Sequence, residues 1–350
     1  MRVSVATGAA AIAAFALIGF GVIGSAQVSG PYTVLKTAKV GGTGAFDYVY
    51  ADANGRKLYI PRPGNPNPRV TVFDLDTLEA AGEIPGANAR GVAVSVKSGH
   101  GFASSKPIVM WGTKTLAVIR KIDLDGGPDG IMYDAFNDRV WVFSHAMPHA
   151  TVINAADGSI AGTIPDLGGA PEQAASDGKG HVYVDIEDKD NIAVVDAKAL
   201  TVTGHYDVAG QGGACAGLAM DVKNNILFAA CRNPAHMVVL NAADGKVITA
   251  LQIGTGTDGA VFNPATGEAF SSQGDGTLTV VRELSPASFM VEQTVKTMPS
   301  AKTLTLDGKT GHILLIGAEY GAPPAPPPAG GRAGRGPMVP DSFSILVVGK

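Results

Sequence analysis

Short apolar segments recur along the chain at a nearly constant spacing, and each ends in an acidic or polar residue. The seven segments end at Asp52, Ser95, Asp134, Asp177, Asp221, Asn263 and Asp307. Consecutive segment ends are 39 to 44 residues apart. Internal repeats with a period of roughly 20 to 50 residues are typical of solenoids and propellers. We therefore infer one repeated unit from the first segment to the end of the chain.

Each unit contains the same order of strand and turn signals. A turn rich in Gly, Asn, Asp and Lys follows the apolar segment, as at 178–180, and a second apolar run follows the turn, as at 181–186. A third run (193–196 in this unit) and an Asp-Gly or similar turn then lead to a fourth. Short apolar or β-branched runs bounded by such turns predict strands. The sequence after residue 26 shows no convincing helical periodicity.

Four strands in about 43 residues are the pattern of a β-propeller blade, so the sequence predicts an all-β, seven-bladed propeller with four-stranded blades. The last unit stops after its third strand, 343–348, and the segment 32–37 offers the missing fourth strand. Pairing these two ends closes the ring and protects both sheet edges. An open β-solenoid is the alternative, and it leaves those edges bare.

The first 26 residues have the pattern of a secretory signal peptide. Arg2 precedes an apolar run, 9–22, and Gly24-Ser25-Ala26 supplies small residues before Gln27. This order of positive, apolar and small residues favours cleavage after residue 26. An uncleaved membrane anchor is the alternative. We expect a single domain over 27–350 in a periplasmic or secreted protein.

The last unit contains an insertion of different composition. Residues 321–341 are rich in Pro and Gly and include two arginines. Such a composition predicts an extended or irregular loop between the second and third strands of the last blade. It is interpreted as a surface loop, with a docking arm for a partner as the alternative.

Overall composition excludes some classes of protein. Of the 350 residues, 45% are hydrophobic, 46 are glycine and 22 are proline, and the net charge is −4. This apolar content excludes a disordered chain, and the charge does not suggest a strongly basic nucleic-acid binder.

The repeats resemble those of the YncE-like, YVTN-type seven-bladed propellers, an exported bacterial family. The segments that carry the resemblance are 126–130 (GGPDG), 182–189 (VYVDIEDK), 274–283 (GDGTLTVVRE) and 342–349 (SFSILVVG). The tetrapeptide that gives the family its name is absent, and 59–62 and 183–186 are its nearest counterparts. The resemblance implies export and a binding role. Single-stranded DNA binding has been proposed within the family.

A ring of charged residues is expected at one mouth of the central channel. The residues five positions before the segment ends are Asp47, Arg90, Asp129, Glu172, Ala216, Asp258 and Lys302. Glu187 and Arg232 belong to loops on the same face. Three interpretations stay open: ion pairs that lock neighbouring blades, with Arg90 between Asp47 and Asp129; a site for a ligand or a divalent cation; and general acid–base chemistry. For a cation such as Ca²⁺ or Mg²⁺, the candidate ligands are Asp129, Glu172 and Asp258.

The histidines and cysteines add less. His145 and His149 lie in one strand-to-strand loop and are interpreted as solvated. No His-Glu-x-x-His motif is present, so the sequence does not support a zinc protease. Cys215 and Cys231 are predicted cross-strand neighbours in the fifth blade. We expect a disulfide, with two free thiols as the alternative. The sequence lacks Cys-x-x-Cys-His, which excludes covalently attached c-type haem.

These observations favour a monomeric, non-enzymatic binding or scaffold protein that engages an unidentified protein or small polar ligand at the charged mouth. A divalent-metal-dependent hydrolase of lactonase type is the alternative. Single-stranded DNA is a further alternative. It requires exposed aromatic side chains beside basic ones, and Trp111 near Lys106 and Lys114 is the one candidate, though Trp111 is expected to pack between blades.

Overall fold

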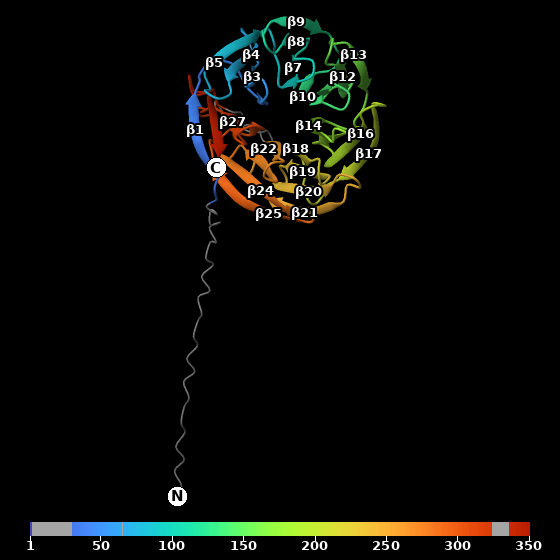
Figure 1. The fold of residues 1–350 in the computed structure, drawn as a ribbon. Helices are drawn as coiled ribbons and strands as arrows, with labels where there is room; N and C mark the ends of the chain where they lie inside the picture. Colours follow the sequence, from blue (N-terminus) through green and yellow to red (C-terminus); the bar gives the residue numbers. More distant parts are fainter. Residues whose placement is uncertain (2–29, 65, 324–335) are drawn as a thin grey trace.

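The computed structural model describes residues 1, 30–64, 66–323 and 336–350. Seven four-stranded antiparallel sheets surround a central opening, which makes the chain a seven-bladed β-propeller (Figure 1). Within the described residues there is no helix. The expected leader, 1–26, lies outside the described residues except for Met1, as does most of the insertion 321–341.

In each blade the strands are arranged side by side, from the innermost strand at the channel to the outermost strand at the rim. The innermost strands are β2 (Tyr50–Asp52), β6 (Val92–Ser95), β10 (Pro128–Asp134), β14 (Pro171–Ser176), β18 (Cys215–Asp221), β22 (Thr257–Asn263) and β26 (Thr303–Leu306). The second strands are β3 (Lys57–Arg62), β7 (His100–Ala103), β11 (Arg139–Ser144), β15 (His181–Ile186), β19 (Ile226–Cys231), β23 (Glu268–Gln273) and β27 (Ile313–Gly317).

The third strands are β4 (Arg69–Asp74), β8 (Ile108–Gly112), β12 (Ala150–Asn154), β16 (Asn191–Asp196), β20 (His236–Asn241), β24 (Thr277–Ser285) and β28 (Ser344–Gly349). The outermost strands are β5 (Ala80–Pro85), β9 (Val118–Ile122), β13 (Ile160–Ile164), β17 (Thr201–Asp207), β21 (Val247–Gln252), β25 (Ser288–Lys296) and β1 (Thr33–Lys39).

The N-terminal strand closes the ring. β1 pairs antiparallel with β28, so the last sheet has the order β1-β28-β27-β26. Beside this pair, Glu268 of the sixth blade contacts both ends of the domain: it accepts a hydrogen bond from the Tyr32 hydroxyl and lies 2.9 Å from Lys350 Nζ. The predicted closure is confirmed. Glu268 joins both ends to the sixth blade, Tyr32 through a hydrogen bond and Lys350 through an ion pair.

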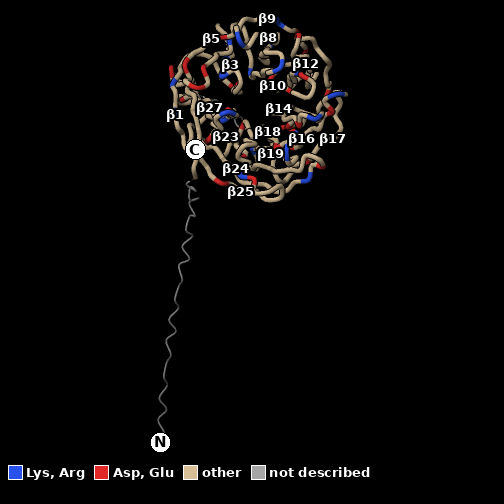
Figure 2. Tube along the Cα trace, viewed as in Figure 1, with Lys and Arg blue, Asp and Glu red and all other residues tan. Residues whose placement is uncertain are grey.

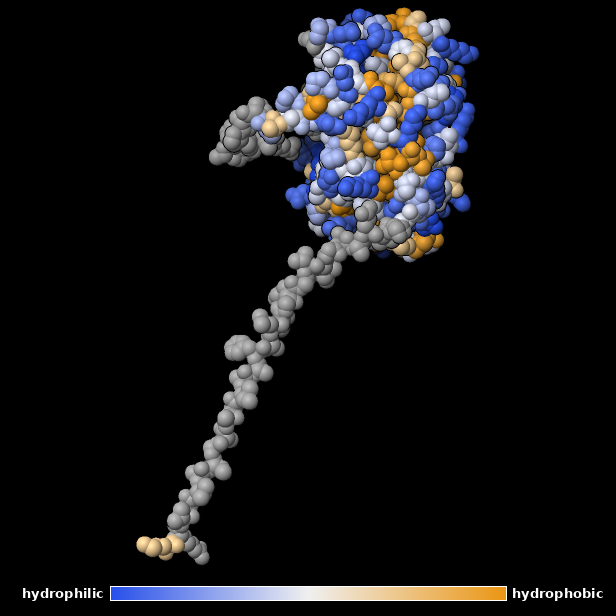
Figure 3. All heavy atoms as spheres, turned by 90° about the vertical axis from the view of Figure 1, so that its left-hand side faces the viewer, coloured by the Kyte–Doolittle hydropathy of each residue, from blue (hydrophilic) through white to orange (hydrophobic). Residues whose placement is uncertain are grey.

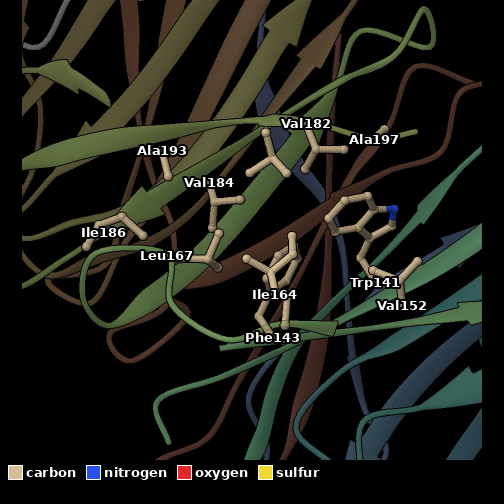
Figure 4. Close-up of a cluster of buried hydrophobic side chains, with 12 residues drawn as sticks. Trp141, Phe143, Val152, Ile164, Leu167, Val182, Val184, Ile186, Ala193 and Ala197 are labelled. Carbon is tan, nitrogen blue, oxygen red and sulfur yellow. The ribbon is translucent and has the colours of Figure 1, made fainter. Parts of the chain in front are cut away.

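The core is divided among the junctions between blades. Trp141 and Phe143 of β11 pack against Val182 and Val184 of β15 at the junction of the third and fourth blades (Figure 4). Tyr183, between those two valines, packs instead against the fifth blade. Side chains alternate between the two faces of a strand, so each blade contributes apolar side chains to both of its neighbours.

The recurrent polar residue at the end of each apolar segment has a structural role in every blade. All seven are at most 7% exposed. Each accepts a hydrogen bond from a backbone N–H two or three residues further on, inside the turn before the second strand. A short polar side chain that bonds the backbone in this way stabilises a tight turn.

On the side of the propeller that Figure 3 shows, apolar side chains form a band across the middle of the outer wall, with hydrophilic residues toward both faces of the propeller. Strongly exposed apolar residues such as Leu35, Ile119 and Ile160 come from different blades. In the part of the chain that the structure describes, no helical segment has the length and apolar character of a membrane span.

Asp177 tests the role of the polar turn residues. Its Oδ1 accepts hydrogen bonds from the N–H groups of Lys179, Gly180 and His181 at 2.7 to 2.9 Å. We expect Asp177→Ala to lower the free energy of unfolding by about 1–3 kcal/mol, because three donors lose their acceptor. Urea denaturation measures the change. Lys179→Ala in the same turn is the control, and an equal loss in both variants contradicts the assigned role.

Glu268 tests the ring closure and gives it a pH dependence. Burial opposes ionisation of its carboxyl group, but hydrogen bonds from Thr266, Tyr32 and Lys350 outweigh burial and lower its pKa from 4.5 to about 2. The stabilisation it provides is therefore present above pH 4.5 and is lost as the pH falls toward 2. We expect Glu268→Gln to cost about 3 kcal/mol at pH 7 and to remove this part of the pH dependence.

Denaturation of both proteins between pH 7 and pH 2 measures the difference. The control is Glu83→Gln, which removes an exposed carboxylate paired with Arg69 and should change stability by less than about 1 kcal/mol. A difference between wild type and Glu268→Gln that stays constant over this pH range contradicts the account.

Candidate functional site

Two sets of side chains meet at one mouth of the channel. The first set lies at or just before the start of the innermost strands and contains the predicted ring. The second set follows directly after the second strands, where His145, Glu187 and Arg232 occupy equivalent positions in consecutive blades. Antiparallel pairing joins the two sets, because Pro128 pairs with Ser144 and Pro171 pairs with Ile186. Charged residues of both signs surround the central opening (Figure 2).

Most of the mouth is occupied by a chain of ion pairs between neighbouring blades. Its six members, in order around the ring, are Arg90, Asp47, Lys302, Asp258, Arg232 and Glu187. Arg90 Nη1 lies 3.3 Å from Asp47 Oδ2, and Arg232 Nη1 lies 2.7 Å from Glu187 Oε2. The arc has the ion pairs between neighbouring blades that the blade-locking interpretation expects, but among the described residues Arg90 pairs with Asp47 alone and not with Asp129. We name this set the ion-pair arc.

Asp129 and Glu172 form the remaining segment of the mouth, where no lysine or arginine forms an ion pair with either residue in the described part of the chain. Both carboxylates instead face His145, whose Nε2 lies 3.7 Å from Asp129 Oδ2 and 3.8 Å from Glu172 Oε1. The same nitrogen is 3.1 Å from the carbonyl oxygen of Pro171. Asp129, His145 and Glu172, together with Glu187 at the end of the ion-pair arc, are here called the acidic segment.

Two carboxyl groups of the acidic segment, those of Asp129 and Glu172, have raised pKa values, so negative charge is disfavoured there. Burial raises the pKa of Glu172 to about 7, with a further contribution from the charge of Glu187, while Arg232 opposes the shift. Burial and, after it, the charge of Asp47 raise the pKa of Asp129, while the charges of His145, Arg90 and Lys302 oppose the shift. Both effects penalise the ionised form. A positive charge placed among these carboxylates would relieve the penalty.

A further carboxyl group lies below the acidic segment. Asp185 is two residues before Glu187, is fully buried, and has no hydrogen-bond partner for either oxygen among the described residues. Burial, followed by the charge of Glu172, raises its pKa well above the usual range. Buried polar groups nearly always have a hydrogen-bond partner, so a buried carboxyl group without one is unusual and lies close to the mouth.

A hydrogen bond crosses the channel beneath the ring. The Tyr48 hydroxyl of the first blade donates to Glu172 Oε2 of the fourth blade at 3.0 Å. Next to Glu172, the Gln173 side chain accepts hydrogen bonds from the backbone N–H groups of Leu218 and Ala260. These contacts fix the position of Glu172. The cavity that Glu172, Gln173 and tyrosines 48, 50 and 133 help to line measures about 280 Å³.

The structure separates residues that the sequence grouped. Asp258, a candidate metal ligand, lies between Arg232 and Lys302, whereas Asp129 and Glu172 share His145. Ala216 supplies no charge at its position in the ring. The interpretation of both loop histidines as solvated is wrong for His149, which is 8% exposed and accepts a hydrogen bond from the Leu167 N–H.

Sequence reasoning missed the contacts of His145 with the carboxylates and the roles of Tyr48 and Asp185. His145, Glu187 and Arg232 are spaced 42 and 45 residues apart, close to the repeat length. Applying the repeat to the residue after each second strand would have placed them on one ring.

The remaining candidates also have defined positions. Cys215 and Cys231 face each other across β18 and β19 and form a disulfide next to Arg232. Trp111 is fully buried and packs against Tyr59, so it offers no exposed surface on which a nucleotide base could stack. Lys106 donates a hydrogen bond to the Gly126 carbonyl oxygen.

Arg232 tests the ion-pair arc. Replacing it with alanine leaves Asp258, which is 7% exposed, without one of its two cationic partners. We expect Arg232→Ala to lower the free energy of unfolding by about 1–3 kcal/mol, less than the full cost of breaking a buried pair because Arg232 is partly solvated. Thermal denaturation measures the change against Arg120→Ala on an outer strand. A loss no greater than that of Arg120→Ala would show that the arc does not stabilise the fold.

No protein-family profile matches this sequence, and neither does any curated protein sequence. Among solved structures, the crystal structure of RRP9 WD40 repeats is similar, with a TM-score of 0.70 and 11% sequence identity. The alignment covers 93% of this chain and 99% of that chain. A likeness at this identity shows the fold alone. The chain is a β-propeller with a WD40-repeat structural neighbour. A hypothesis about its ligand has to come from the residues of its own channel mouth.

Proposed function

We propose that this chain is an exported, non-enzymatic binding protein that receives a positively charged ligand or partner group at the acidic segment of the channel mouth. The observation that carries the proposal is the uneven pairing of charge around the mouth. The cations of the ion-pair arc are engaged by Asp47, Asp258 and Glu187, while Asp129 and Glu172 have only His145 as an ionic partner among the described residues.

Complementarity of charge gives this arrangement its selectivity. A ligand with a positive group meets carboxylates whose raised pKa values reflect burial and mutual repulsion. Its charge therefore stabilises the bound state. An anionic ligand would have to separate the existing ion pairs and would gain less. The geometry favours a cationic ligand over nucleic acid for this reason.

Two observations support export. The first 26 residues have the order of a secretory leader. The only two cysteines of the chain form a disulfide, and disulfides persist mainly in oxidising compartments. Both features fit a periplasmic or secreted protein.

A metal-dependent hydrolase of lactonase type is the second candidate function. It is favoured by one observation, that ligand atoms of His145, Glu172 and Glu187 all lie within 4.8 Å of one another. The hydrolase additionally requires turnover of a substrate. Release of product from a lactone panel by the metal-loaded protein distinguishes it from a binding protein.

The proposal is tested by thermal denaturation with charged probes. Spermidine and hexalysine are the cationic probes, and heparin and a single-stranded oligo-dT are the anionic ones. We expect the Tm to rise steadily with the concentration of a cationic probe above its Kd, because a ligand that binds the folded state alone stabilises it by about 2.7 kcal/mol at a hundred times its Kd. The double variant Asp129→Asn/Glu172→Gln should lose at least tenfold in affinity.

The control is Glu79→Gln/Asp244→Asn, which removes the same charge from exposed positions elsewhere on the ring. It should bind as the wild type does. Stabilisation by the anionic probes alone, or equal binding by the Asp129/Glu172 variant, would contradict the proposal. So would the lack of any shift with spermidine, hexalysine and divalent metal ions alike.

A further inference from the structure

We infer that His145, Glu172 and Glu187 form a binding site for a divalent transition-metal ion, with Zn²⁺ preferred to Ca²⁺ or Mg²⁺. This inference deepens the proposed function, on which it rests, by naming the class of cation that the acidic segment takes. The site lies at the junction of the third and fourth blades, with Asp129 beside it.

The positions of the ligand atoms support coordination of a single ion. One nitrogen of His145 and one oxygen from each of Glu172 and Glu187 are all within 4.8 Å of one another. Ligand atoms bound to one ion at 2.0 to 2.2 Å must lie within about 4.4 Å of one another, so a small closure of the side chains completes the set. His145 is on a loop and 42% exposed, so its ring can move.

Neighbouring groups already orient the two glutamates. Tyr48 donates to Glu172 Oε2, while Glu172 Oε1 faces His145. Arg232 Nη1 donates to Glu187 Oε2 and leaves the other oxygen of that carboxylate for an ion. Hydrogen bonds from outside a metal site that hold its carboxylates in place are typical of protein metal centres.

Asp185 provides an independent observation. It is the next-to-last residue of β15, two positions before Glu187. It is fully buried, and its oxygens have no partner among the described residues. The charge of Arg232 acts on this carboxyl without a hydrogen bond to it, and a cation held by Glu172 and Glu187 would add positive charge beside it. Ion pairs with Arg232 and Lys302 already provide such charge for Asp258.

The donor set selects the metal. Ca²⁺ and Mg²⁺ prefer oxygen ligands throughout, whereas an imidazole nitrogen with carboxylates suits Zn²⁺ and related transition-metal ions. Coordination through Nε2 requires the His145 tautomer with its proton on Nδ1. The contact of Nε2 with the Pro171 carbonyl oxygen is then replaced by the bond to the ion.

The test is calorimetric titration of the chelator-treated protein, residues 27–350, with Zn²⁺ and with Ca²⁺. We expect one equivalent of Zn²⁺ to bind, and His145→Ala and Glu172→Gln each to weaken binding at least tenfold. His205→Ala, an exposed histidine on the outer strand β17, is the matched control and should bind as the wild type does. Co²⁺ serves as a spectroscopic probe, and its visible absorption should change in His145→Ala.

The outcomes separate this inference from the proposed function. Zn²⁺ binding that is unchanged in His145→Ala, preferential binding of Ca²⁺, or no binding of Zn²⁺ each overturns the metal site. If spermidine still raises the Tm of the wild type in those cases, the cation-binding function stands without the metal. If spermidine binds and Zn²⁺ competes with it, both proposals are supported, because the two share Glu172.

Discussion

The rest of the structure depends on the hydrogen bonds that a buried polar side chain at the end of each innermost strand accepts from the backbone of the following turn. These hydrogen bonds fix where the second strand begins. A slip of one residue would exchange the two faces of the strand. The register in turn places the start of each innermost strand beside the end of the second strand, as Pro171 lies opposite Ile186. The channel mouth is built from these adjoining ends.

The blades and the closure of the ring could be predicted from the sequence. The spacing of the polar turn residues predicts the blades, and the unpaired strands at the two ends predict the closure of the ring by β1 and β28. The predicted second strand at 181–186 agrees with β15. Strand boundaries are predictable here because turn residues and apolar runs are local signals that each blade repeats.

The pairing of charges at the mouth could not be predicted in the same way. Ring position alone does not show that Arg232 reaches both Glu187 and Asp258, because that depends on side-chain length across two blade junctions. Nor does it show that Tyr48 crosses the channel to Glu172. The sequence predicts His145 at the mouth only when the repeat is applied to the residue after each second strand. At the mouth, the positive and negative charges of the ion-pair arc therefore balance each other, whereas the acidic segment has an excess of carboxylates.

The most direct measurement of the central claim is an anomalous difference map at the zinc absorption edge, from crystals of the protein grown with Zn²⁺. We expect a peak between the third and fourth blades, about 2.0–2.2 Å from His145 and from an oxygen of Glu172 or Glu187. Peaks confined to surface histidines elsewhere, with the acidic segment arranged as it is here, would contradict it.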